Sequence, residues 1–191
     1  SIFHNNQINK DWSYAVNFNV AYVKNEITDM CDTDGQDPDN SKFWRLEGYP
    51  IGSFYGYVAD GLFKTQEELS TLPKRTGTEK LGDIKYKDLN GDGKITAADR
   101  DVIGKNFPTW TGGLNVAVYY KNFDFSMLWQ GAFDVDAYYT GEAAYAFFNS
   151  GKVLTKHMDR FHEVNNPNGN FPRLSLSDQT NYQTSSYWLE D

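Results

Sequence analysis

The stretch "GGLNVAVYYKNFDFSMLWQG", residues 112–131, decides the fold of this chain. Apolar side chains recur at every second position before and after the pair Lys121 and Asn122. A two-residue apolar rhythm predicts a β-strand, and two such strands separated by two residues predict a tight hairpin. We therefore expect strands near 112–121 and 122–132, with a mild break at Leu128. The apolar positions are Leu114, Val116, Val118, Tyr120, Phe123, Phe125, Met127 and Trp129.

The segment "WSYAVNFNVAYVKN", which begins at Trp12, has the same rhythm and predicts a third strand near 11–25. Its length suits a tilted membrane strand, and its apolar face has aromatic residues near both ends, as at the two interfaces of a bilayer. A strand of a soluble β-sandwich would also carry one apolar face. Both interpretations stay open on this segment alone.

The composition narrows the function classes. The formal net charge of −8 disfavours binding to a nucleic-acid backbone. The 13 Tyr, 13 Phe, 5 Trp and 16 Gly favour β-structure. The lone Cys31 excludes an internal disulfide. No apolar run approaches the length of about 20 residues that a membrane helix needs. The strands of a membrane barrel would not show such a run, because their apolar and polar residues alternate.

Two long stretches, 28–110 and 134–185, flank the predicted hairpin. Compact domains rarely contain loops of this length, whereas short turns at one end and long loops at the other are typical of outer-membrane barrels. We expect both stretches to be extracellular. Helices are predicted over 65–73, from a Thr65/Glu68 capping box, and over 96–104.

The segment "YKDLNGDGKITAADRDVIG", residues 86–104, contains the pattern of a calcium-binding loop from position 88 to position 99. Calcium binds six to eight hard oxygens, and carboxylates offset its charge. The predicted ligands are Asp88, Asn90, Asp92, the Lys94 carbonyl, Thr96 through a water, and Asp99. The alternative is an ordinary turn rich in Asn, Asp and Gly. If calcium binds, we expect a single ion to order a long loop that has no core of its own.

Four segments together resemble SusC/RagA-type TonB-dependent outer-membrane transporters of Bacteroidetes, in their C-terminal half. These segments are "GYPIGSFYGYVADGLF", the long run from "LGDIKYKDLNGDG" through "NFPTWTGGLNVAVYYKNFDFSMLWQGAF", "KHMDRFHEVNNPNGNFPRLS" and "SSYWLED". The resemblance covers essentially the whole chain. Its most specific part is the calcium-type loop followed by the hairpin.

The resemblance implies an all-β fold, as part of a large antiparallel transmembrane β-barrel that has 22 strands in the family. It also implies import of oligosaccharides or peptides, driven by the TonB complex, with a SusD-like surface lipoprotein as partner. A signal peptide, a plug with its TonB box and a terminal barrel strand are not recognised in residues 1–191, so a barrel fragment is expected.

Other candidate sites are weaker. The aromatic residues Tyr138, Tyr139, Tyr145, Phe147 and Phe148 are predicted to contact a ligand or partner, or alternatively to pack within their own loop. No nucleophile or acid–base constellation emerges from the histidines or the carboxylate pairs, so no enzyme is expected. The main alternative function is a secreted or surface β-domain that binds carbohydrate and is stabilised by calcium. A calcium-dependent hydrolase is the weakest hypothesis.

Overall fold

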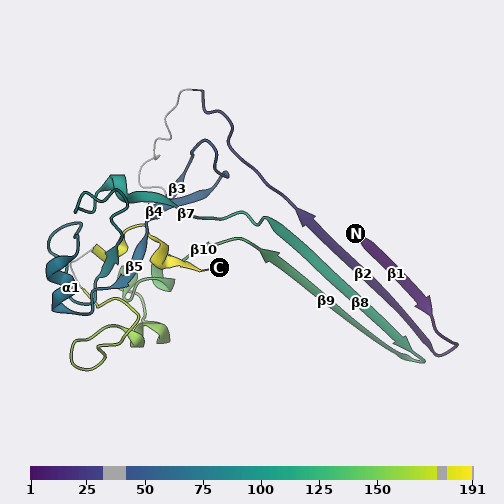
Figure 1. Ribbon diagram of the computed structural model, residues 1–191. Coiled ribbons are helices and arrows are strands. Elements are labelled where there is room, and N and C mark those ends of the chain that lie inside the picture. Colours follow the sequence, from purple (N-terminus) through teal and green to yellow (C-terminus); the bar gives the residue numbers. More distant parts are fainter. Residues whose placement is uncertain (32–41, 176–179, 191) are drawn as a thin grey trace.

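A computed structural model of the protein describes residues 1–31, 42–175 and 180–190. A long flat sheet extends from a lobe that gathers at one of its ends (Figure 1). The sheet has the order β1-β2-β8-β9, and every neighbouring pair is antiparallel. Its strands are β1 (Ile2–Gln7), β2 (Trp12–Tyr22), β8 (Trp110–Tyr120) and β9 (Phe123–Phe133). The three predicted strands are confirmed, and β1 was missed because "IFHNNQ" has no clear apolar rhythm.

The register of the sheet places the aromatic residues in rows across three strands. Trp12, Tyr120 and Phe123 are paired near the turns. Tyr22, Trp110 and Phe133 are paired near the lobe, and smaller apolar residues lie between the two rows. The predicted apolar residues therefore share one face. The other face carries mostly polar and small side chains, together with Phe3, Tyr119 and Leu128.

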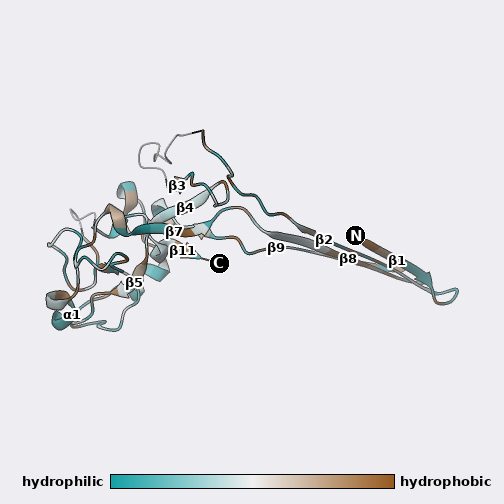
Figure 2. Cartoon of the chain, turned by 45° about the horizontal axis from the view of Figure 1, so that its top comes forward, coloured by the Kyte–Doolittle hydropathy of each residue, from teal (hydrophilic) through white to brown (hydrophobic). Residues whose placement is uncertain are grey.

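Within the described residues, no second sheet covers the apolar face. Phe18 is 44% exposed and Phe125 is 57% exposed. Figure 2 shows the strands nearly edge-on, as a single thin layer. Packing between two sheets of a sandwich would bury these side chains, so the described residues give the sandwich interpretation of the β2 segment no support.

The lobe is built from the two long stretches that flank the hairpin and from residues 186–190, which follow the second stretch. Its three small sheets have the orders β3-β4-β7, β5-β6 and β10-β11. Their strands are β3 (Phe43–Trp44), β4 (Ser53–Tyr57), β7 (Arg100–Lys105), β5 (Ala59–Leu62), β6 (Ile84–Tyr86), β10 (Ala137–Tyr138) and β11 (Leu189–Glu190). The helices are α1 (Gln66–Thr71) and the short 3-10 turns η1 (Ala97–Asp99), η2 (Gly141–Ala143), η3 (Phe148–Ser150), η4 (Thr155–Asp159), η5 (Thr180–Tyr182) and η6 (Ser186–Trp188). No helix in the described part of the chain is both long and apolar enough to cross a membrane.

The lobe has a hydrophobic core, so the expectation of a loop without a core is wrong. Side chains from both long stretches make this core, and neither stretch supplies it alone. Its buried members are Tyr57, Leu62, Ile84, Tyr86, Ile95, Ala144, Phe161 and Trp188. The apolar residues are scattered along the sequence and become a cluster only when the two stretches meet.

The helix predictions had different outcomes. The Thr65/Glu68 capping box is present at the start of α1, as predicted. The helix expected over 96–104 is wrong beyond Asp99, where the chain enters β7 and pairs with β4. The β-branched Val102 and Ile103 suit this strand, and tertiary pairing overrides the helix signal.

A buried ion pair joins the two halves of the lobe. The Asp83 carboxylate is fully buried and lies 2.7 Å from Arg173 Nε. It also accepts hydrogen bonds from Arg173 Nη2 at 3.1 Å and from Asn181 Nδ2 at 2.9 Å. Asn181 Oδ1 in turn accepts from the Ile84 N–H at 2.9 Å. The first stretch is thus held to the second by charge and by hydrogen bonds.

Candidate functional site

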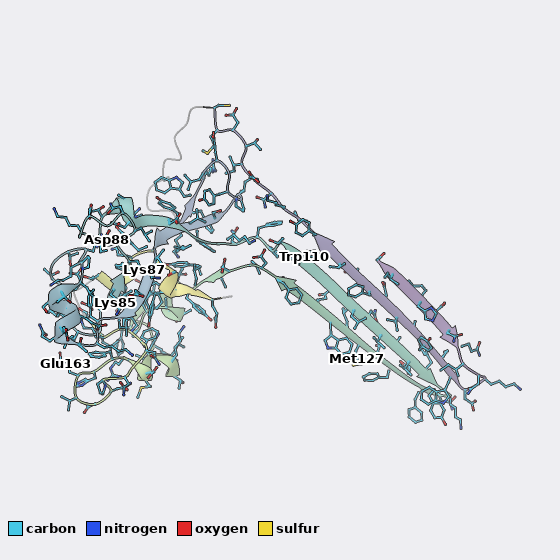
Figure 3. The ribbon with its side chains drawn as sticks, in the orientation of Figure 1. Lys85, Lys87, Asp88, Trp110, Met127 and Glu163 are labelled. Atoms are coloured by element: carbon cyan, nitrogen blue, oxygen red, sulfur yellow. The ribbon has the colours of Figure 1, made fainter. Side chains whose placement is uncertain are left out.

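The predicted calcium loop lies between β6 and β7, at the edge of the lobe. Figure 3 shows Lys85, Lys87 and Asp88 in succession along β6 and just beyond its end. Ile95, the apolar residue in the middle of the loop, is buried in the lobe core. Ile95 therefore fixes the loop to the lobe core, and the polar side chains of the loop remain accessible to solvent.

The first half of the loop is folded around the side chains of the predicted ligands. The Asp88 carboxylate accepts from the N–H groups of Gly91 and Gly93, both at 2.7 Å. Gly93 has φ of +81°, the left-handed conformation that the motif requires at this position. Asn90 Oδ1 accepts from the Asp92 N–H at 2.9 Å, and Asp92 Oδ1 accepts from the Lys94 N–H at 2.8 Å.

Asp99 closes the loop from a fully buried position. Its carboxylate accepts from the N–H groups of Thr96 at 2.7 Å and Leu89 at 3.0 Å. A longer bond of 3.3 Å comes from the Asn90 N–H. The hydrogen bond from the Thr96 N–H is the main reason that the pKa of Asp99 lies below its usual range. The closing carboxylate is therefore ionised and fixed in place.

The donor set fits calcium in type and order, but its carboxylates are not gathered around one point. No group of three His, Cys, Asp or Glu side chains among the described residues is arranged to hold a metal ion. Each carboxylate oxygen that accepts one N–H keeps a second lone pair. Calcium binding would thus require Asp88, Asp92 and Asp99 to move closer together while keeping these backbone bonds.

The five predicted aromatic contact residues fall into two groups. The ring centroids of Tyr138 and Phe54 lie 5.5 Å apart with the rings tilted, and burial raises the pKa of Tyr138. Tyr139 and Tyr145 are also partly buried and pack against the core. Phe147 and Phe148 remain 55% and 38% exposed. The structure thus places the tyrosines within the lobe and leaves the two phenylalanines available at its surface.

A cavity of about 260 Å³ lies beside this aromatic segment. Tyr145 and Phe147 line it, and so do Phe171, Tyr182 and Trp188, which were not singled out from the sequence. The ring centroids of Tyr145 and Tyr182 are 4.3 Å apart. Nothing in the spacing of these residues along the chain signals that they meet, because the lobe brings them together from three separate segments.

The remaining titratable candidates have structural roles. His157 is buried against Phe171, and its Nδ1 accepts from the Leu154 N–H at 3.1 Å. His162 Nδ1 accepts from nearby backbone N–H groups in its own turn. Glu68 caps α1 and pairs with Lys85 at 2.7 Å.

Lys105 ties the lobe to the ends of two sheet strands. Its ammonium pairs with Asp134, just after β9, at 2.6 Å and donates to Thr109 Oγ1, just before β8, at 2.7 Å. Asp136 accepts from the Lys105 N–H at 2.7 Å. The carboxylates of Asp134 and Asp136 therefore help to connect β7 of the lobe to the ends of β8 and β9.

The polar face of the sheet is rich in side-chain amides and poor in charge. The register puts Asp124 on this face, opposite Tyr119, as the single charged residue of the four described strands there. The amides are exposed and can both donate and accept hydrogen bonds. They are Asn5, Gln7, Asn17, Asn19, Asn115 and Gln130.

Comparisons with known proteins find relatives that are all TonB-dependent receptors. No protein-family model matches the chain. The chain is 33% identical to TonB-dependent receptor P3 of Formosa agariphila over 138 residues, which are 68% of this chain and 14% of the relative. It is 26% identical to TonB-dependent receptor SusC of Bacteroides thetaiotaomicron over 200 residues, which are 96% of this chain and 18% of the relative.

The fold is also found in a solved structure. The backbone matches a chain of the RagAB peptide transporter with a TM-score of 0.70 at 18% identity, over 99% of this chain and 20% of that chain. The chain therefore spans a fifth or less of the length of each of these three proteins.

Proposed function

Since this chain belongs to the SusC/RagA-type TonB-dependent receptors of the outer membrane, we propose that its sheet is part of the wall of a barrel that imports nutrients. The family comprises receptors and transporters rather than enzymes. The lobe then represents the part of the receptor that meets the substrate outside the cell.

The exposed apolar face with its two aromatic rows carries this proposal. Trp12 and Tyr22 lie at the two ends of β2. At about 3.3 Å per residue, the ten steps between them span about 33 Å of strand. With a strand tilt of about 40°, this corresponds to about 25 Å across the membrane, the height of the apolar band of outer-membrane barrels. The two rows then lie at the two lipid interfaces.

For the substrate, we propose oligosaccharides. The nearly uncharged, amide-rich polar face offers donors and acceptors that suit the hydroxyl groups of a neutral sugar chain. The cavity lined by Tyr145, Tyr182 and Trp188 adds aromatic surface in the lobe. Peptides are the second candidate, because the solved structure with this fold is described as a peptide transporter.

The proposed partners follow from the place of the chain in the whole receptor. A SusD-like surface lipoprotein would cover the lobe, where Phe147 and Phe148 offer exposed aromatic surface. The TonB complex would supply energy through parts of the receptor outside this chain.

We also propose that the loop from Asp88 to Asp99 binds calcium. Asp88, Asn90, Asp92 and Asp99 would contribute side-chain oxygens, and Lys94 would contribute its carbonyl. The pre-folded backbone and the ionised, buried Asp99 support this proposal. Bound calcium would offset the mutual repulsion of the three carboxylates and add binding free energy to the stability of the lobe.

The test uses the full-length receptor in its own host. Deleting its gene should abolish uptake of labelled oligosaccharides, and restoring the gene should recover uptake only in cells with a working TonB complex. The receptor should also require detergent for purification. A monodisperse protein in plain buffer would instead favour the secreted carbohydrate-binding domain.

A further inference from the structure

Two turns end the sheet at the side away from the lobe (Figure 1). One comprises residues 8–11, between β1 and β2, and the other is Lys121 and Asn122, between β8 and β9. The Lys121 N–H donates to the Asp11 carbonyl at 2.8 Å, so the two turns touch. Asn9 Oδ1 accepts from the N–H groups of Asp11 at 2.9 Å and Trp12 at 3.0 Å. The turns therefore form one ordered end of the sheet.

Lys121 occupies an unfavourable backbone conformation in this end. Its φ is +52°, in the left-handed region that Gly and Asn adopt more readily than Lys. An Asn is available in the turn, but it is the next residue, Asn122. A long cationic side chain at such a position points to a role beyond the geometry of the turn.

The Lys121 side chain lies over the apolar face of the sheet. Its Nζ is 5.2 Å from the ring centroid of Tyr120. The Tyr120 ring is 4.4 Å from that of Trp12, and Phe123, paired with Tyr120, is 78% exposed. The ammonium is thus at the edge of an aromatic group that faces lipid.

No carboxylate of the described residues forms an ion pair with Lys121. Of the nearby acidic residues, Asp124 lies on the opposite, polar face, and Asp11 contacts Lys121 through its backbone carbonyl. Lys10 and Asp11, which are adjacent in the neighbouring turn, are both exposed and offset each other in charge. The apolar side of this end therefore carries a cation that an anion from outside the chain can neutralise.

We propose that Lys121 binds the headgroup phosphate of an anionic phospholipid. Trp12, Tyr120 and Phe123 would pack against the glycerol and the upper acyl carbons of the same lipid. Lysines next to an anionic bilayer surface gain attraction, and aromatic rings prefer the interface. This inference rests on the sheet crossing the outer membrane, and it does not depend on what the receptor imports.

The test places a photo-crosslinking amino acid at Asn122 of the full-length receptor. The receptor is reconstituted in vesicles with equal amounts of phosphatidylglycerol and phosphatidylcholine, and captured lipids are identified by mass. We expect the wild-type turn to capture phosphatidylglycerol several-fold in excess. Lys121→Asn should reduce this preference about fivefold, the loss expected for one lysine near the surface.

The choice of Asn separates binding from folding. Asn tolerates the left-handed conformation, so Lys121→Asn should fold at least as well as the wild type in an unfolding assay. Lys121→Arg should keep the preference, and Lys24→Asn, at the other end of the sheet, should not alter it. Capture in proportion to vesicle composition, or an unchanged preference in Lys121→Asn, would overturn the proposal.

Discussion

Replacing Arg173 by Ala is the most direct way to test how the lobe is held together. Asp83 is fully buried, and Arg173 is its only cationic partner among the described residues. Removing the guanidinium leaves an uncompensated carboxylate in the interior, and breaking a buried pair in this way costs about 3–5 kcal/mol. At about 1.4 kcal/mol per factor of ten, the lobe should open roughly a hundredfold to several-thousandfold more often.

Hydrogen exchange of the Ile84 N–H measures this opening in the full-length receptor. This amide donates to Asn181 Oδ1, which belongs to the same network, so it exchanges when the two halves of the lobe separate. We expect its exchange in Arg173→Ala to accelerate by the factor given above, with amides of β8 unchanged. Lys24→Ala removes an exposed, paired lysine and serves as the control.

A second variant tests the physical reason. Replacing Asp83 by Asn together with Arg173 by Met removes both charges, and it should restore most of the protection. The Ile84 N–H in Arg173→Ala could instead exchange within about threefold of the wild-type rate. The free energy of opening would then have changed by less than about 1 kcal/mol, and the pair would not hold the lobe together.

Three further predictions concern the loop, the junction and the sheet. Asp92→Ala should weaken calcium binding about tenfold or more in a calorimetric titration, since one charged ligand is lost, and an unchanged isotherm would reject the site. The hydrogen bond from Lys105 lowers the pKa of Asp134 below its usual 3.8. The contribution of this ion pair to stability is therefore fully present above pH 3.8 and is lost as the pH falls further, which a pH series of hydrogen-exchange rates would show. Met127→Arg, on the apolar face, should cost about 2–4 kcal/mol in refolding into lipid, whereas Ser126→Arg on the polar face should cost little, and equal costs would contradict the assignment of the faces.

The strands of the sheet could be predicted because their signal is local. Alternation of apolar residues fixes both the strand and its faces, and the two-residue turn at Lys121 and Asn122 fixes the register of the hairpin. β1 lacks this rhythm, and its place beside β2 depends on pairing rather than on its own side chains. The calcium-type loop was also visible in the sequence, since its ligand types occur at fixed spacing.

The lobe could not be predicted in the same way. Its core joins Ile84 to Trp188 and Ala144 to Ile95, residues that are far apart in the chain. The strand at Val102 was misread as helix because its partner, β4, lies some fifty residues earlier. The cavity depends on the same long-range contacts, which neither composition nor periodicity reports.

The shared core of the lobe sets an order of events during biogenesis. The segment before β8 is synthesised first, yet Ala144, Phe161 and Trp188 of the buried core belong to the segment after β9. The earlier segment therefore cannot complete its hydrophobic core until the later segment is available. For anyone who wishes to exchange recognition surfaces between related receptors, the two segments are one transplantable unit, and a graft of either alone would be left with half an interior.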